Sequence, residues 1–170
     1  MNYREARAYI EEIPRNKGEL GLDAIRALLD ETGHPERKLS FIHIAGTNGK
    51  GSVLSHISTV LTYAGYRVGR YISPTLYSYR ERIQVNGGYI SREDFTRLTE
   101  VIREGVKRME AKGLSKPSPF ELETVLGFLY FAQQRCDYVV LECGLGGLND
   151  ATNVIPMENK KAAVLTSISM

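Results

Sequence analysis

Apolar residues recur every three or four positions in several separate stretches of the chain, which is the spacing of a helix with one buried face. Helices are expected over residues 3–13, 21–32, 53–64, 91–109 and 119–136. Pro14 follows the first of these helices and Gly33 the second, and both residue types commonly end helices. The fifth helix is apolar on nearly every side, so we expect it to be buried.

Short continuous apolar runs between these helices predict strands. They cover residues 41–44, 67–72, 138–141 and 162–168, and Asn86-Gly87 predicts the turn of a hairpin over 82–90. Strands that alternate with helices predict an α/β fold, with a mostly parallel central sheet flanked by helices in three layers. All 170 residues are expected to form one domain, with residues 1–38 as its N-terminal helical segment.

Composition narrows the class of protein. Hydrophobic residues make up 42% and charged residues 25% of the chain, as in ordinary globular domains. The formal net charge of +2 gives no basic stripe, so nucleic-acid binding is not expected. The longest apolar stretch, 125–132, is far shorter than the ~20 residues that cross a bilayer, so no membrane association is expected. Cys136 and Cys143 lack the spacing of a zinc or redox site, which favours two buried thiols in the cytoplasm.

A glycine-rich segment follows the first predicted strand and precedes a predicted helix. It consists of Gly46, Thr47, Asn48, Gly49, Lys50, Gly51 and Ser52. Glycines let backbone N–H groups approach phosphate oxygens, and the helix N-terminus adds partial positive charge. Lys50 supplies a full charge that can reach the β- and γ-phosphates, so the segment predicts a nucleotide-binding loop. It departs from the common pattern G-x-x-x-x-G-K-[ST], because position 44 is isoleucine and Gly51 separates Lys50 from Ser52.

In this altered form, the loop resembles the ATP loop of the muramyl-peptide ligase superfamily. Its Lys50-Gly51-Ser52 segment resembles the corresponding segment of the folylpolyglutamate synthase/dihydrofolate synthase branch. Other segments are similar to motifs of that branch, in the same order: Ser73-Pro74 with Glu81-Arg82, Phe120-Glu121 with Thr124, Glu142 to Gly147, and Asp150-Ala151-Thr152-Asn153. The chain is identified as similar to the family's ATP-binding, Mur-ligase-like domain, which implies ATP as the nucleotide and Mg²⁺ as the metal. Leu148 and Thr75 stand where the family has arginine and histidine.

Glu142 ends the apolar strand 138–141, where an ionised carboxylate needs a partner because burial is costly for a charge. A magnesium ion is a suitable partner, since it is a hard cation that takes oxygen ligands. The resemblance implies that Ser73 and Glu142 hold this metal and that Lys50 and Glu142 are catalytic.

The resemblance further implies a set of residues that bind folate or pteroate: Phe120, Glu121, Arg82 and Asp150. Glu121 has a second interpretation, because Ser118, Pro119 and Glu121 also form the sequence signature of a helix capping box. The two roles are compatible.

The implied activity is that of a cytoplasmic, monomeric, ATP-dependent ligase. A carboxylate of folate or dihydropteroate takes the γ-phosphate of ATP, and the amine of L-glutamate then displaces phosphate from the acyl phosphate to form an amide. The residues 166–170 resemble the start of a further family motif, and the sequence ends there. We therefore expect a truncated chain that lacks the C-terminal ligase domain and is inactive alone.

Three alternatives stay open. A cell-wall amino-acid ligase of the Mur type would share the loop, although Lys50-Gly51-Ser52 argues against it. A P-loop kinase or GTPase would carry a Walker-B acid and no Asp-Ala-Thr-Asn segment. A stand-alone P-loop nucleotide-binding module would fit the expected truncation.

Overall fold

The computed structural model describes residues 1–13, 21–144 and 146–169. Its strands are β1 Phe41–Ala45, β2 Val68–Tyr71, β3 Ile83–Val85, β4 Gly88–Tyr89, β5 Tyr138–Glu142 and β6 Lys160–Leu165. Within the described residues they form one sheet in the order β4-β3-β2-β5-β1-β6. The four strands from β2 to β6 in this order are parallel, whereas β3 pairs antiparallel with both β2 and β4. The predicted mostly parallel sheet is confirmed.

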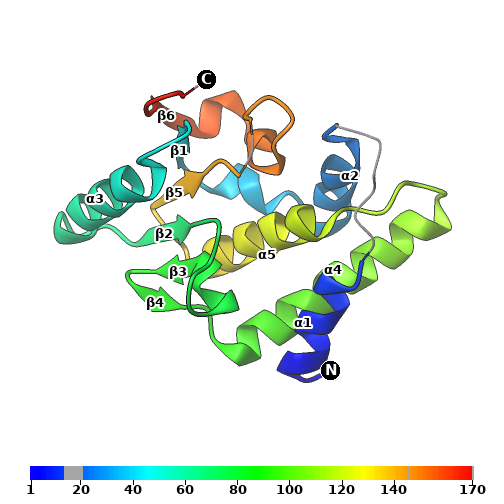
Figure 1. Ribbon diagram of the computed structural model, residues 1–170. Helices are drawn as coiled ribbons and strands as arrows, with labels where there is room; N and C mark the ends of the chain where they lie inside the picture. The colour runs from blue at the N-terminus through cyan, green and yellow to red at the C-terminus, as the bar shows by residue number, and fades with distance from the viewer. Residues whose placement is uncertain (14–20, 145, 170) are drawn as a thin grey trace.

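Helices cover both faces of the sheet (Figure 1). They are α1 Tyr3–Glu11, α2 Asp23–Thr32, α3 Lys50–Tyr63, α4 Arg92–Ala111 and α5 Pro119–Gln133. α3 lies on one face, against β1, β2 and β5, while α5 lies on the other face and is surrounded by α1, α2 and α4. The α/β architecture with helix layers on both sides of the sheet is therefore as predicted.

Side chains of the central strands alternate between two cores, because successive residues of a strand point to opposite faces. Phe41, Tyr71 and Leu141 are fully buried in the larger core beneath α5. Ile44 is equally buried in the smaller core, where it packs with Leu54 of α3. The carboxyl ends of β1 and β5 are thus packed on both faces. β1 leads into the glycine-rich loop, and β5 ends at Glu142.

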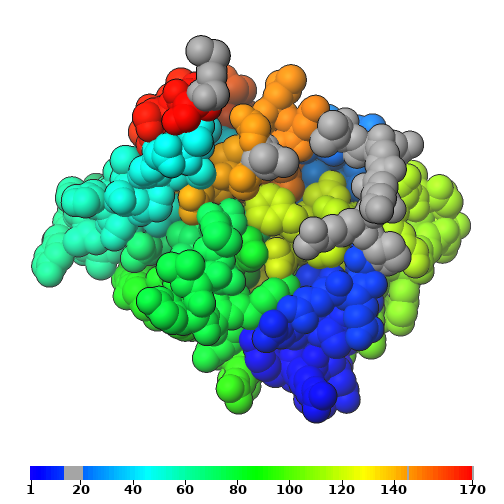
Figure 2. All heavy atoms as spheres, in the orientation of Figure 1, coloured from blue at the N-terminus to red at the C-terminus, as the bar shows by residue number. Residues whose placement is uncertain are grey.

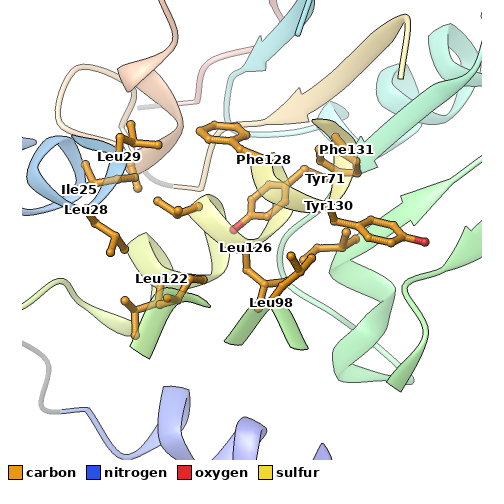
Figure 3. Packing of buried hydrophobic residues seen from close by; sticks show 14 of the residues in the cluster. Ile25, Leu28, Leu29, Tyr71, Leu98, Leu122, Leu126, Phe128, Tyr130 and Phe131 are labelled. Carbon is orange, nitrogen blue, oxygen red and sulfur yellow. The ribbon is translucent and has the colours of Figure 1, made fainter. Parts of the chain in front are cut away.

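α5 is buried on nearly every side, as its sequence predicts. Ser118 caps its N-terminus: the Ser118 hydroxyl accepts from the Glu121 N–H, and the Glu121 carboxylate accepts from the Ser118 N–H, which confirms the capping box. Phe128 and Phe131 gather with Tyr71 at the sheet (Figure 3). The helix start, which carries two of the predicted substrate residues, is therefore held by the core and by its cap.

Several predicted boundaries need correction. α3 begins at Lys50, not at residue 53, because Gly49 adopts a left-handed conformation and acts as the N-cap. β6 spans Lys160–Leu165 instead of 162–168, because the residues that follow turn back to hydrogen-bond with the glycine-rich loop. α1 and α5 end two to three residues earlier than predicted. The predicted hairpin is confirmed, with positive φ at both Asn86 and Gly87.

The predicted buried thiols are confirmed for Cys136 and Cys143. None of the helices in the described part of the chain has the length and apolar character needed to cross a membrane.

The close approach of β2 to α5 gives a test of the packing. A methyl group on Gly69 would lie 2.7 Å from Cδ1 of the buried Phe131 ring. We expect Gly69→Ala to lower the free energy of unfolding by about 1–3 kcal/mol through overpacking. Gly88→Ala in β4 is the matched control, because its nearest neighbour would be at an ordinary 3.5 Å. Denaturant unfolding measures both variants, and equal stability of the two would contradict this packing.

Candidate functional site

The glycine-rich loop leaves the sheet at the carboxyl end of β1, next to the carboxyl end of β5. The two strands pair in parallel with Ile44 opposite Glu142, so the loop and the acid start from the same edge of the sheet. Gly46 has a φ of 137°, and a Cβ there would lie 2.0 Å from the Thr166 hydroxyl oxygen. Glycine is therefore required at position 46 for conformation and for space.

The first turn of α3 can accept an anion. The backbone N–H groups of Lys50, Gly51 and Ser52 lie in the first turn of the helix, so the helix itself supplies no carbonyl acceptor for them. Gly51 and Ser52 are exposed, and among the described residues no side chain caps this end of the helix. Exposed N–H groups at a helix N-terminus, together with the helix dipole, are a common phosphate-binding arrangement.

The Lys50 side chain folds back over the loop. Its Nζ donates to the carbonyl oxygen of Gly46 at 2.9 Å and lies 3.4 Å from that of Thr47. The same Nζ is 4.0 Å from Oε1 of Glu142. The lysine charge is thus already between the loop and the acid, where a phosphate chain would need it.

Residues 166–169 pack against the loop from the other side. The carbonyl oxygen of Ser167 accepts from the N–H of Thr47 at 2.9 Å, and Asn48 forms an isolated bridge with Ser167. Figure 2 shows these C-terminal residues lying over the start of α3. This contact could not be predicted from the sequence, because nothing in the local pattern indicates which segment covers the loop.

Glu142 is buried, with 6% of its surface exposed. Its Oε2 accepts from the N–H of Ser73 at 3.1 Å. Burial raises the pKa of Glu142 above its usual value, although the Ser73 N–H and the charges of Lys50 and Arg82 oppose this shift. The carboxylate is therefore poorly compensated and is suited to receive a further positive charge.

Ser73 and Glu142 fit a magnesium ion. Both are oxygen donors, and the carboxylate lacks full compensation in its buried position. The described residues contain no cluster of three or more His, Cys, Asp or Glu that could hold a metal by themselves. Magnesium is the metal that such a sparse site suits, since it keeps several waters and is shared with substrate phosphates.

A cleft of about 800 Å³ lies beside this end of the sheet. It runs between the start of α2, residues 114–118, the start of α5 and residues 146–151. Phe120, Glu121 and Asp150 line it, so three of the four predicted substrate residues are brought together. Leu148, where the resemblance leads us to expect arginine, also lines the cleft and is 81% exposed.

Arg82 is outside the lining of the cleft but lies behind one wall. Its guanidinium carbon is 5.6 Å from the centre of the Phe120 ring. Two of its buried nitrogens, Nε and Nη1, make no hydrogen bond to any described residue. Nε nevertheless forms an ion pair with Glu123, so the guanidinium charge is partly compensated, and both nitrogens are buried behind the wall of the cleft.

Two of the predicted substrate residues also have structural partners. The Glu121 carboxylate accepts from Ser118 in the capping box at 2.6 Å. Asp150 is buried and accepts from the N–H of Gly144 at 3.0 Å and from the N–H of Thr152 at 2.9 Å. Their contact with a substrate stays a prediction.

Sequence reasoning missed Glu123. This buried acid lies 3.3 Å from Arg82 Nε and accepts from the Tyr79 hydroxyl. Burial and the Glu123 charge both raise the pKa of Tyr79, so its hydroxyl keeps its proton and remains a donor. The signal was present, because Glu123 is the single charged residue in the mostly apolar stretch 122–132.

The parallel sheet, the glycine-rich strand-to-helix turn and the lysine beside a strand-end acid define a P-loop nucleotide-binding α/β domain. No protein-family model matches the chain. Along its length, however, the chain is similar to the folylpolyglutamate synthases and dihydrofolate synthases, and the resemblance recognised in its motifs is confirmed.

Two curated relatives illustrate this similarity. The dihydrofolate synthase/folylpolyglutamate synthase of Bacillus subtilis is 40% identical over 167 residues, which cover 98% of this chain and 38% of the relative. The folylpolyglutamate synthase of Lacticaseibacillus casei is 35% identical and is matched over 39% of its length. The chain therefore spans about two fifths of the length of these relatives.

Solved structures agree. An FPGS complex with AMPPCP and folate superposes with a TM-score of 0.94 at 34% identity, covering all of this chain and 41% of that one. The folylpolyglutamate synthase of Thermotoga maritima has a TM-score of 0.89 at 40% identity, over 99% of this chain and 38% of that chain.

The raised pKa of Glu142 predicts a gain in stability when its charge is removed. A carboxyl whose pKa is raised by folding costs stability at every pH above that pKa, and the cost disappears below its usual value near 4.5. Glu142→Gln should therefore raise the Tm at pH 7 without magnesium, and the gain should vanish at pH 4. The exposed Glu158→Gln is the control. A lower Tm for Glu142→Gln at pH 7 would contradict the assignment.

Proposed function

We propose that the chain is the ATP·Mg²⁺-binding part of an ATP-dependent ligase that joins a folate or dihydropteroate carboxylate to L-glutamate. The observation that carries this proposal is the 4.0 Å approach of Lys50 to Glu142 at the edge of the sheet that also borders the 800 Å³ cleft. The similarity to synthases of this name supports the same activity.

The residues of the loop have different roles in phosphoryl transfer. The N–H groups of Lys50, Gly51 and Ser52 bind phosphate oxygens, and the Lys50 ammonium leaves the Gly46 carbonyl to neutralise charge that builds up on the γ-phosphate. Ser73 and Glu142 would hold the magnesium ion, which supplies further charge neutralisation when bound. A preorganised contact of this kind stabilises a transition state by about 3 kcal/mol.

The cleft positions the other substrate. Phe120 provides an aromatic wall for a pterin ring, and the positive charge of Arg82 behind it favours an electron-rich ligand. The substrate carboxylate attacks the γ-phosphorus, which gives an acyl phosphate and ADP. The amine of L-glutamate then attacks the acyl carbon, phosphate leaves, and an amide forms. Alignment of the reacting groups can account for about 7–11 kcal/mol of the barrier.

A cytoplasmic location and a monomeric parent enzyme stay predictions. The two buried thiols, Cys136 and Cys143, suit a reducing compartment. Burial raises the pKa of Cys136 to about 12, so this thiol is protonated and unreactive at neutral pH.

Nucleotide binding is tested with Lys50→Met. Removal of the ammonium should weaken binding of AMPPCP in the presence of Mg²⁺ at least tenfold, because one charge-assisted contact to phosphate is lost. Calorimetric titration measures the Kd. Lys107→Met on the exposed side of α4 is the control and should bind like the wild type. Equal affinity of Lys50→Met and the wild type would refute the phosphate-binding role.

Substrate binding is tested with Phe120→Ala. Loss of the aromatic wall should weaken folate binding about tenfold or more and leave AMPPCP binding unchanged. Tyr63→Ala, which removes an aromatic ring that is 89% exposed on α3, is the control. A chain that binds AMPPCP but shows no folate binding would instead be a nucleotide-binding module of another kind.

A further inference from the structure

One histidine connects β1 to the cleft. His43 lies three residues before Gly46 on β1, and its side chain is buried, with 7% exposed. Its Nε2 is 2.8 Å from the hydroxyl oxygen of Thr152, which is completely buried. That hydroxyl in turn contacts Oδ1 of Asp150. The three side chains form a continuous hydrogen-bonded chain inside the protein.

The direction of the protons in this chain follows from the donors available. A carboxylate can only accept, so the Thr152 hydroxyl donates its single proton to Asp150. The Thr152 oxygen must then accept from His43, which requires the proton on Nε2. Burial and the nearby Lys160 charge lower the pKa of His43 to about 4, so the ring is neutral at pH 7. His43 is therefore the Nε2–H tautomer.

Asp150 extends this series of hydrogen bonds to Gly144 and to Thr152, which lie on either side of residues 146–151 at the cleft. Its Oδ1 accepts from the Thr152 N–H at 2.9 Å, and its Oδ2 accepts from the Gly144 N–H at 3.0 Å. Gly144 lies against the Phe120 ring, since a Cβ on Gly144 would come within 2.8 Å of Cζ of Phe120. The hydrogen-bonded chain thus reaches from β1 to the aromatic wall of the cleft.

We propose that His43 is a positioning residue: by donating from Nε2 to Thr152, it orients Asp150 and so holds the cleft wall in a fixed relation to the phosphate loop on the same strand. This inference rests on the proposed function for the identity of the ligand in the cleft. The hydrogen bonds from His43 through Thr152 and Asp150 to Gly144, which are the geometric part of the inference, do not depend on any ligand. The alignment of the two sites is what in-line phosphoryl transfer to a bound carboxylate requires.

The geometric part is tested by nuclear magnetic resonance of the ¹⁵N-labelled chain. Ring spectra should show the proton of His43 on Nε2 and none on Nδ1. In Thr152→Val, the Gly144 amide should exchange with solvent at least tenfold faster. Thr99→Val is the matched control, because Thr99 is equally buried and its hydroxyl donates to the carbonyl oxygen of Phe95 within α4. A proton on Nδ1, or unchanged exchange at Gly144, would overturn the proposal.

The functional part is tested by two substitutions at one position. His43→Gln keeps a side-chain N–H donor and should retain folate binding within about threefold of the wild type. His43→Leu lacks the donor and should weaken folate binding about tenfold, with AMPPCP binding unchanged in both. Rescue by glutamine distinguishes hydrogen bonding from simple packing. His34→Gln, at a partly exposed histidine paired with Asp30, is the control.

The outcomes separate this inference from the proposed function. If the wild type binds folate and His43→Leu binds it equally well, the positioning role is wrong and the proposed function is unaffected. If the wild type binds no folate, the proposed function fails, and the His43 tautomer with the Gly144 exchange rate still decides whether the hydrogen-bonded chain exists. If His43→Leu does not fold, His43→Gln together with Thr152→Val decides the outcome by the same measurements.

Discussion

The parallel pairing of β1 with β5 is the constraint on which the site depends. It places Ile44 opposite Glu142, so the loop that leaves one strand and the acid that ends the other meet at one edge of the sheet. Ile44 is held in the core beneath α3, and the sheet therefore fixes the spacing between Lys50 and Glu142 before any ligand binds. This arrangement buries the Glu142 carboxylate and raises its pKa. A bound cation would offset the unfavourable burial of that charge.

The same strand serves the second site from its other face. Ile44 points toward α3, whereas His43 points toward residues 150–152. β1 thus carries the glycine-rich loop after its end, and His43, three residues before Gly46, reaches Thr152 beside the cleft. α5 completes the cleft, because its capped start carries Phe120 into the lining of the cleft. The body of α5 is anchored in the core, where Leu122, Leu126 and Phe128 are buried (Figure 3).

Much of this could be predicted from the sequence, because local patterns determine it. The strand-like run at 41–44, the glycines and Lys50 identify the loop, and Ser118 with Glu121 identifies the cap. What the sequence could not give are contacts between distant segments. The pairing of Arg82 with Glu123, and the burial of Asp150 among its own loop's N–H groups, depend on how the elements pack.

The central claim is that the loop and Glu142 serve one nucleotide and one metal ion, and paramagnetic broadening tests it most directly. Mn²⁺ with AMPPCP, added to the ¹⁵N-labelled chain, should broaden the amide signals of Gly51, Ser52, Ser73 and Glu142 together, because all would lie around the same ion. Broadening confined to the loop, with sharp signals from Ser73 and Glu142, would contradict the account.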